Sequence, residues 1–166
     1  SDRHIMSLLR SRRKTMIDVL FNRLIDMAGI DIKEIWAWPD APPILLEEVI
    51  SEKERGLLGS KEPYGDTWKY PVKVERDKEY HISRIIYFMD HPEEISGIEV
   101  DNPCFDNGIL PGCLIIDGWH RVAAGVLLKL EKVSIEYGGR SDVEDYISGK
   151  TDNRPEEILF LNLPMY

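Results

Sequence analysis

The chain has 166 residues and a formal net charge of −9; 43% of its residues are hydrophobic and 31% are charged. This composition fits one soluble globular domain with a sizeable core, and so acidic a body repels nucleic acid unless local basic features bind it. No apolar run approaches the roughly 18 residues that a membrane span requires, so we expect a cytoplasmic protein without membrane insertion. The two cysteines, Cys104 and Cys113, fit neither a zinc pattern nor a disulfide framework.

The N-terminal segment is basic, although the chain as a whole is acidic. Residues 1–14 contain five basic side chains and one acidic side chain. Residues 1–5, which precede Met6, read as an expression scar. We therefore treat residues 1–15 as a basic arm that either binds nucleic acid or forms a solvated helix start or tail. The residues predicted to contact nucleic acid are Arg10, Arg12, Arg13 and Lys14.

Residues 16–166 are predicted to form one α/β domain with a helical N-terminal extension. Apolar residues recur with helical or alternating spacing, and glycine and proline mark the breaks between these segments. The segments predict a small mixed sheet of four or five short strands, flanked by about five helices. The predicted helices cover 16–28, 44–55, 80–89, a segment from 119 and another after 140, and the predicted strands cover 35–38, 72–74, 97–101, 114–116 and 133–137.

The segment at 113–128 joins a short strand to a helix through Gly118. Glycine permits a tight turn, and the first N–H groups of a helix have no partner within the helix. These donors, the helix dipole and an arginine in the first turn favour a bound phosphate group. Taken singly, Asp117 also fits a helix cap, His120 a surface histidine and Arg121 a solvated charge. The predicted nucleotide-binding residues are Gly118, Trp119, His120 and Arg121, with Arg140 as a weaker candidate.

Arg140 belongs to a second helix start, where two glycines follow the strand at 133–137. Ser141 and Glu144 have the spacing of a capping box, in which each side chain bonds a backbone N–H group of the first turn. This capping box explains the two residues without a function, so Arg140 is a weaker anion-binding candidate than Arg121.

The run Asp-Gly-Trp-His-Arg-Val-Ala-Ala at residues 117–124 follows a short strand and resembles the signature of the ParB/sulfiredoxin superfamily. The resemblance covers roughly residues 70–140 and implies that this loop and helix start hold nucleotide phosphates. Sulfiredoxin chemistry needs a nucleophilic cysteine directly before His-Arg, and this chain has Trp119 there. The helix-turn-helix and dimerisation domain of partition ParB proteins is also missing. We therefore expect neither a sulfiredoxin nor a centromere-binding protein.

Acidic residues are expected near the phosphate site. Glu99 and Asp101 share one face of the strand at 97–101 because successive strand side chains alternate. The resemblance implies that this strand runs beside the one that ends at Asp117. Three carboxylates beside a phosphate can hold Mg²⁺, which prefers oxygen ligands, or they are solvent-facing acids. The predicted catalytic residues are Glu99, Asp101, Asp117 and His120, and the predicted metal ligands are Asp117 and Glu99.

The small ParB-like core with its helical extension is also similar to plasmid fertility-inhibition factors of the oncogenic-suppression type. This similarity implies a cytoplasmic bacterial protein with ATPase and DNase activity that blocks DNA transfer through type IV secretion. The expected cofactors are ATP and a divalent metal, Mg²⁺, and the expected partners are DNA undergoing transfer and secretion components. In this scheme His120 holds phosphate or protonates a leaving oxygen.

Two other functions use the same predicted site. A nucleotide-sensing or protein-inhibiting module would bind the nucleotide only to set a conformation. A phosphotransferase acting on a small metabolite would suit the acidic body better than an enzyme that holds DNA.

Overall fold

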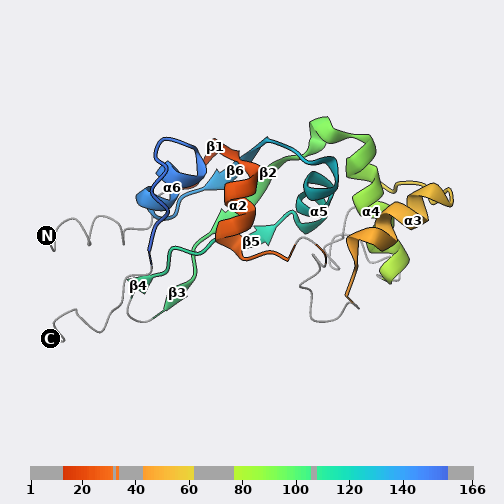
Figure 1. Cartoon of the computed structure of the whole chain (residues 1–166), viewed down its shortest axis with the longest axis horizontal. Helices are drawn as coiled ribbons and strands as arrows, with labels where there is room; N and C mark the ends of the chain where they lie inside the picture. The colour runs from red at the N-terminus through yellow and green to blue at the C-terminus, as the bar shows by residue number, and fades with distance from the viewer. Residues whose placement is uncertain (1–12, 32, 34–42, 62–76, 106–107, 157–166) are drawn as a thin grey trace, which may run out of the picture. The chain divides into compact units, whose positions relative to one another are not determined.

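The computed structural model describes residues 13–31, 33, 43–61, 77–105 and 108–156 (Figure 1). Its contacts divide the chain into two compact units. The first unit comprises residues 1–29, 97–117 and 131–166, and the second comprises residues 30–96 and 118–130. The strand β5 therefore belongs to the first unit, and the helix that follows it in the chain belongs to the second.

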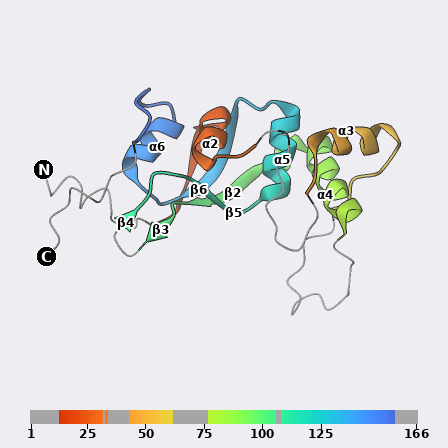
Figure 2. The same ribbon diagram turned by 60° about the horizontal axis from the view of Figure 1, so that its bottom comes forward.

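The first unit contains a four-stranded sheet in the order β1-β6-β2-β5 (Figures 1 and 2). Its outer pairs, β1 with β6 and β2 with β5, are antiparallel. The four strands are β1 (Thr15–Leu20), β6 (Lys132–Tyr137), β2 (Ser96–Asp101) and β5 (Leu114–Asp117). The described residues also form five α-helices, so the predicted α/β class with a four-stranded sheet and about five helices is confirmed.

One face of this sheet forms the core of the first unit. Val19 pairs with Val133 and Val100 pairs with Ile115, and all four side chains are buried. The helix α2 (Phe21–Ala28) follows directly from β1, and the carbonyl of Met27 near its end accepts a hydrogen bond from the Cys113 N–H group beside β5 at 2.8 Å. Because β1 and β5 are the two edges of the sheet, α2 spans the sheet from one edge to the other.

The predicted helix over residues 16–28 is wrong in its first part, because Thr15–Leu20 is a strand and the helix begins only at Phe21. The residues of β1 alternate, with Met16 and Asp18 exposed and Val19 buried against β6. The apolar residues of this segment fit one side of a helix and one face of a strand equally well. The segment is a strand because it pairs with β6. The helical N-terminal extension is accordingly shorter than expected.

The second unit contains three helices and a short 3₁₀ turn among its described residues. The side chain of Asp77 caps α4 by accepting a hydrogen bond from the Tyr80 N–H group at 2.8 Å, and the buried side of α4 includes Ile82, Ile85 and Ile86. These elements are α3 (Leu46–Glu54), α4 (Lys78–Asp90), η1 (Pro92–Glu94) and α5 (Trp119–Leu128).

Most of the other predicted helices and strands are present in the structure. The helices at 44–55, 80–89 and from 119, the helix after 140, and the strands at 97–101, 114–116 and 133–137 are confirmed within a few residues. The strands β2 and β5 form a hairpin, and its connection contains a small strand pair, β3 (Cys104–Phe105) and β4 (Gly108–Ile109). The strands expected at 35–38 and 72–74 lie outside the described residues.

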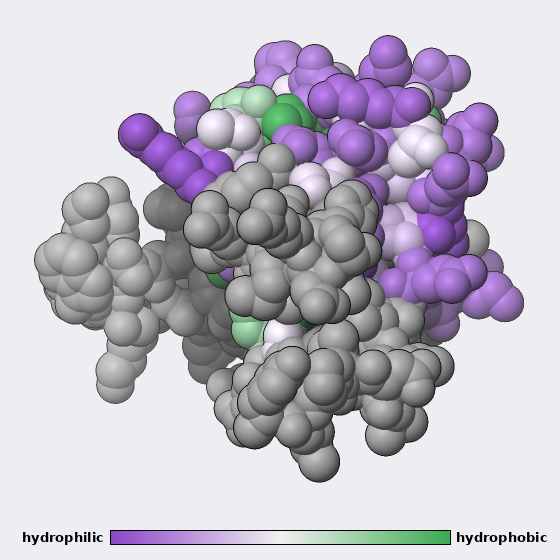
Figure 3. Space-filling model, turned by 90° about the vertical axis from the view of Figure 1, so that its left-hand side faces the viewer, coloured by the Kyte–Doolittle hydropathy of each residue, from purple (hydrophilic) through white to green (hydrophobic). Residues whose placement is uncertain are grey.

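The surface of the described residues is consistent with the acidic composition. On the side of the molecule drawn in Figure 3, these residues are mostly hydrophilic, with small apolar areas between them. Within the described part of the chain, no helix is long and apolar enough to cross a membrane.

Candidate functional site

The start of α5 has the backbone geometry that the sequence predicts. Gly118 is the N-cap residue, with φ 106° and ψ 24°, and no side chain caps the helix there. The first helical hydrogen bond runs from the Val122 N–H group to the Gly118 carbonyl at 2.9 Å. A positive φ of this size favours glycine, and the positive end of a helix dipole favours an anion.

The guanidinium group of Arg121 lies against this glycine. A Cβ atom on Gly118 would lie 3.0 Å from Arg121 Nη2, and Arg121 Nη1 donates a hydrogen bond to the Ser96 carbonyl at 2.5 Å. Arg121 therefore places positive charge close to the positive end of the α5 dipole. Both features attract an anion to the same place. Trp119, the first residue of α5, is only partly exposed.

His120 faces the protein interior. Only 9% of its surface is exposed, and its Nε2 atom lies 3.0 Å from Nδ1 of His81, which is 1% exposed and belongs to α4. The two rings are stacked with their centroids 5.2 Å apart. Burial, followed by the nearby His81, Arg84 and Arg121, lowers the pKa of His120 to about 3. His120 is thus neutral near pH 7, and its ring packs between α4 and α5. Its roles as phosphate ligand and proton donor stay predictions.

The two predicted metal ligands pair across adjacent strands. Glu99 on β2 is the register partner of Asp117 on β5, next to a β-bulge, and Asp101 pairs with Leu114. Directly paired residues have Cβ atoms about 5 Å apart. The expected convergence of three carboxylates is wrong for the described residues, since no three His, Cys, Asp or Glu side chains among them could together hold a metal ion. The pair of Glu99 and Asp117 is what the structure brings together.

Lys14 belongs to this acidic face. Its Nζ atom lies 2.5 Å from Glu99 Oε1 and 3.9 Å from Asp101 Oδ2. The hydrogen bond to Glu99 raises the pKa of Lys14. The ammonium group of Lys14 is thus held by carboxylates, and its contact with nucleic acid stays a prediction. Of the other arm residues, Arg13 is exposed, and Arg10 and Arg12 lie outside the described residues.

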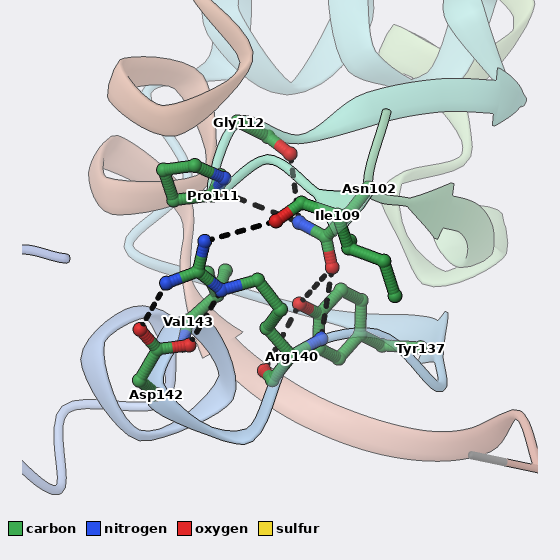
Figure 4. Close-up of polar contacts among 8 residues, drawn as sticks. All are labelled: Asn102, Ile109, Pro111, Gly112, Tyr137, Arg140, Asp142 and Val143. Carbon is green, nitrogen blue, oxygen red and sulfur yellow. Dashed lines mark hydrogen bonds and ion pairs between the residues drawn. The ribbon is translucent and has the colours of Figure 1, made fainter. Parts of the chain in front are cut away.

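Arg140 is the centre of a buried polar cluster, drawn in Figure 4. Its side chain is 1% exposed and forms two hydrogen bonds to the carboxylate of Asp142, at 3.0 and 2.6 Å, and one to the Ile109 carbonyl at 3.1 Å. The guanidinium is thereby occupied by groups of the protein, so the prediction that Arg140 binds an anion is wrong. The capping box is wrong as well, because the N-cap residue of α6 (Ser141–Ile147) is Arg140 and not Ser141, and the side chain of Arg140 does not cap the helix.

Asn102 joins this cluster to the sheet and was not predicted. Its Oδ1 atom accepts hydrogen bonds from the Tyr137 hydroxyl at 2.6 Å and the Arg140 N–H group at 2.9 Å. Its Nδ2 atom donates to the Gly112 carbonyl at 2.7 Å (Figure 4). A Cβ atom on Gly139 would lie 1.8 Å from Asn102 Oδ1, so only glycine fits at that position. The sequence signal was an asparagine directly after a strand, which by itself indicates only a turn.

Comparison with known proteins identifies no relative of this chain. No family model, curated protein or solved structure matches the chain.

Proposed function

We propose that the chain binds the phosphates of ATP at the start of α5 and hydrolyses this nucleotide. The observation that supports binding is a left-handed glycine at a helix start without a side-chain cap, with a guanidinium group lying over it. N–H donors, the helix dipole and an arginine at one point favour phosphate oxygens. In this proposal the binding residues are Gly118, the backbone of Trp119 and His120, and Arg121.

Glu99 and Asp117 are the proposed ligands of Mg²⁺. They are carboxylates, the donor type that Mg²⁺ prefers, and they are paired residues of adjacent strands. Asp117 directly precedes Gly118 in the chain, so one ligand of the pair is next in sequence to the proposed phosphate-binding residues. When bound, the metal supplies positive charge to phosphate oxygens. Asp101 is the proposed acceptor of the proton from the attacking water.

DNA cleavage and interference with plasmid transfer form the wider part of the proposal. Both derive from the resemblance of residues 117–124 to ParB-like proteins and to fertility-inhibition factors. In this reading the protein acts in the bacterial cytoplasm on DNA undergoing transfer by type IV secretion.

Two observations favour a second candidate function, a module that binds a nucleotide without turnover. Lys14 already neutralises Glu99, and His120 is buried and neutral. A phosphate-binding helix start can change conformation when its ligand binds and still lack a proton donor.

The test measures ATP binding, phosphate release and cleavage of single- and double-stranded DNA, in Mg²⁺ or EDTA. Arg121→Ala is expected to weaken ATP binding by about 1.5 to 3 kcal/mol, the value of a hydrogen bond to a charged group. The matched control is Arg55→Ala, which removes an arginine that is 72% exposed and paired with Glu52. Equal ATP affinity in Arg121→Ala and the wild type would remove the phosphate assignment.

Glu99→Gln separates the two candidate functions. An enzyme that uses this carboxylate should keep its ATP affinity and lose phosphate release, whereas Glu136→Gln, an exposed acid on the neighbouring strand β6, should keep both. Saturable ATP binding without phosphate release in the wild type would establish the binding module instead.

A further inference from the structure

Arg84, on α4, is a half-buried arginine that bonds no carboxylate among the described residues. Its Nη1 atom donates a hydrogen bond to the Ser60 carbonyl at 3.1 Å, and its guanidinium carbon lies 4.9 Å from the ring centroid of Phe88 and 5.8 Å from that of Tyr87. These partners are neutral. Carboxylates bond four other described arginines, which are Arg23, Arg55, Arg140 and Arg154.

The neutral partners compensate the charge of Arg84 only in part. Its Nε atom is buried and has no hydrogen-bond partner among the described residues. Burial lowers the pKa of Arg84, and the positive charge of Arg121 lowers it further. Tyr80, Tyr87 and Glu94 each raise this pKa by less than burial lowers it. Because arginine stays protonated in proteins, an anion that binds here stabilises a charge that the protein itself leaves poorly paired.

Arg84 belongs to the contact between α4 and the first turn of α5. The two helices pack against each other within the second unit and lie side by side in both ribbon views (Figures 1 and 2). His81 of α4 meets His120 of α5 at 3.0 Å between ring nitrogens. Arg84 follows His81 by three residues, a spacing that puts both on one side of a helix, and Arg121 follows His120 directly. The packing thus brings two arginines to the same histidine pair.

Two guanidinium groups can bind more oxygens than one phosphate offers. Each group can bond two oxygens through parallel N–H donors, and a terminal phosphate has three acceptor oxygens. At the start of α5, Arg121 Nη2 and Nε would lie 3.0 and 3.2 Å from a Cβ atom on Gly118, so this edge of its guanidinium faces the helix start. A second arginine nearby therefore favours a ligand in which two or more phosphates are linked.

We propose that Arg84 is a second phosphate-binding residue of the site at the start of α5, and that Arg84 and Arg121 together select ligands with at least two linked phosphates. This inference rests on the proposed function, since it concerns the same site. The helix start and Arg121 hold one phosphate, and Arg84 holds the next. A purely structural Arg84, which held Ser60 and Phe88 in place, would affect every ligand of the site alike.

The test measures the affinity of the full chain for ATP, inorganic tripolyphosphate and AMP by calorimetry in EDTA, so that no divalent metal contributes. Arg84→Met keeps an apolar stem beside Phe88 and removes the charge. We expect this variant to bind ATP and tripolyphosphate about 10- to 100-fold more weakly and AMP at most about 3-fold more weakly, because only the linked phosphates lose a charge-assisted hydrogen bond. Arg121→Met should weaken the binding of all three ligands.

The matched control is Arg55→Met, which removes an arginine that is 72% exposed and paired with Glu52, and which should leave all three affinities unchanged. Urea unfolding checks that each variant is folded. If Arg84→Met does not fold, Arg84→Lys takes its place. It keeps the charge and loses the planar fork, so the ratio of ATP affinity to AMP affinity should fall at least about 3-fold.

Three results would overturn the inference: wild-type ATP affinity in Arg84→Met, equal losses for ATP and AMP, or an unchanged affinity ratio in Arg84→Lys. ATP binding that needs Arg121 and not Arg84 would leave the proposed function in place and remove only this inference. Tripolyphosphate binding that needs both arginines, without phosphate release from ATP, would support the inference and remove the proposed hydrolysis.

Discussion

The starts of α5 and α6 look alike in sequence and differ in structure. Each follows a strand, and each has glycine and arginine at the start of the helix. At α6, Arg140 is 1% exposed and bonds Asp142 and the Ile109 carbonyl. At α5, Arg121 is partly exposed and lies over Gly118. One arginine is part of the core, and the other lies where a ligand can reach it.

A carboxylate two residues further along the chain accounts for the difference. Asp142 accepts both ends of the Arg140 fork and also a hydrogen bond from the Val143 N–H group. The position two residues after Arg121 is Ala123, which offers no such group. A helix start with glycine and arginine therefore predicts an anion site only where the helix itself does not supply the anion.

Gly139→Ala should have the largest effect on stability, because its Cβ atom would lie 1.8 Å from Asn102 Oδ1. Displacing Asn102 also breaks its hydrogen bonds to Tyr137 and Arg140, and we expect a loss of about 4 kcal/mol in urea unfolding. The matched variant at the other start, Gly118→Ala, meets only the flexible end of Arg121 and a positive φ. Its cost should be about 1 to 2 kcal/mol. Equal losses would contradict the distinction between the two starts.

Asp142→Ala should have the next largest effect on stability, because it leaves the guanidinium of Arg140 buried without the carboxylate that it bonds. Asp142 is itself 30% exposed, so water compensates part of the loss, and we expect about 2 to 3 kcal/mol. The control is Asp152→Ala, which removes a 93% exposed partner of Arg23 and should cost at most about 0.5 kcal/mol. A stability close to wild type for Asp142→Ala would show that Arg140 does not need its internal anion.

The pH dependence of stability tests the buried histidine at the start of α5. In the folded chain the pKa of His120 is about 3, whereas an unfolded histidine has a pKa near about 6.5. Between these values the unfolded chain binds a proton that the folded chain does not. Stability should therefore fall as the pH is lowered, by about 2 kcal/mol between pH 7 and pH 5.

Replacement of His120 by Gln should remove this part of the pH dependence, although it also lowers stability at pH 7 through the lost contact with His81. His91→Asn, which changes a histidine outside the pair, should keep the slope. An undiminished slope in the His120→Gln variant would mean that the proton binds elsewhere.

The sequence predicts local features of this molecule better than its long-range contacts. The periods of apolar residues and the positions of glycine locate the helix α4, the strands β2, β5 and β6 and the turn at Gly118. They do not distinguish a strand from a helix at 15–20, where pairing with β6 decides. The polar contacts that give Lys14 and Asn102 their roles join residues 85 and 38 positions apart, and no local pattern encodes such a distance.

The smallest expected effect on stability is that of Arg121→Ala. A cation in the first turn of α5 opposes the helix dipole, and its guanidinium donates a hydrogen bond to the exposed Ser96 carbonyl, so its removal should change the free energy of unfolding by at most about 0.5 kcal/mol. The helix α4 provides the matched comparison, since Asp77→Ala removes a true side-chain cap and should cost about 1 kcal/mol. A loss in Arg121→Ala that exceeds the loss in Asp77→Ala would identify Arg121 as a structural residue like Arg140. A small loss of stability combined with weakened ATP binding would mean that Arg121 contributes to ligand binding rather than to the stability of the fold.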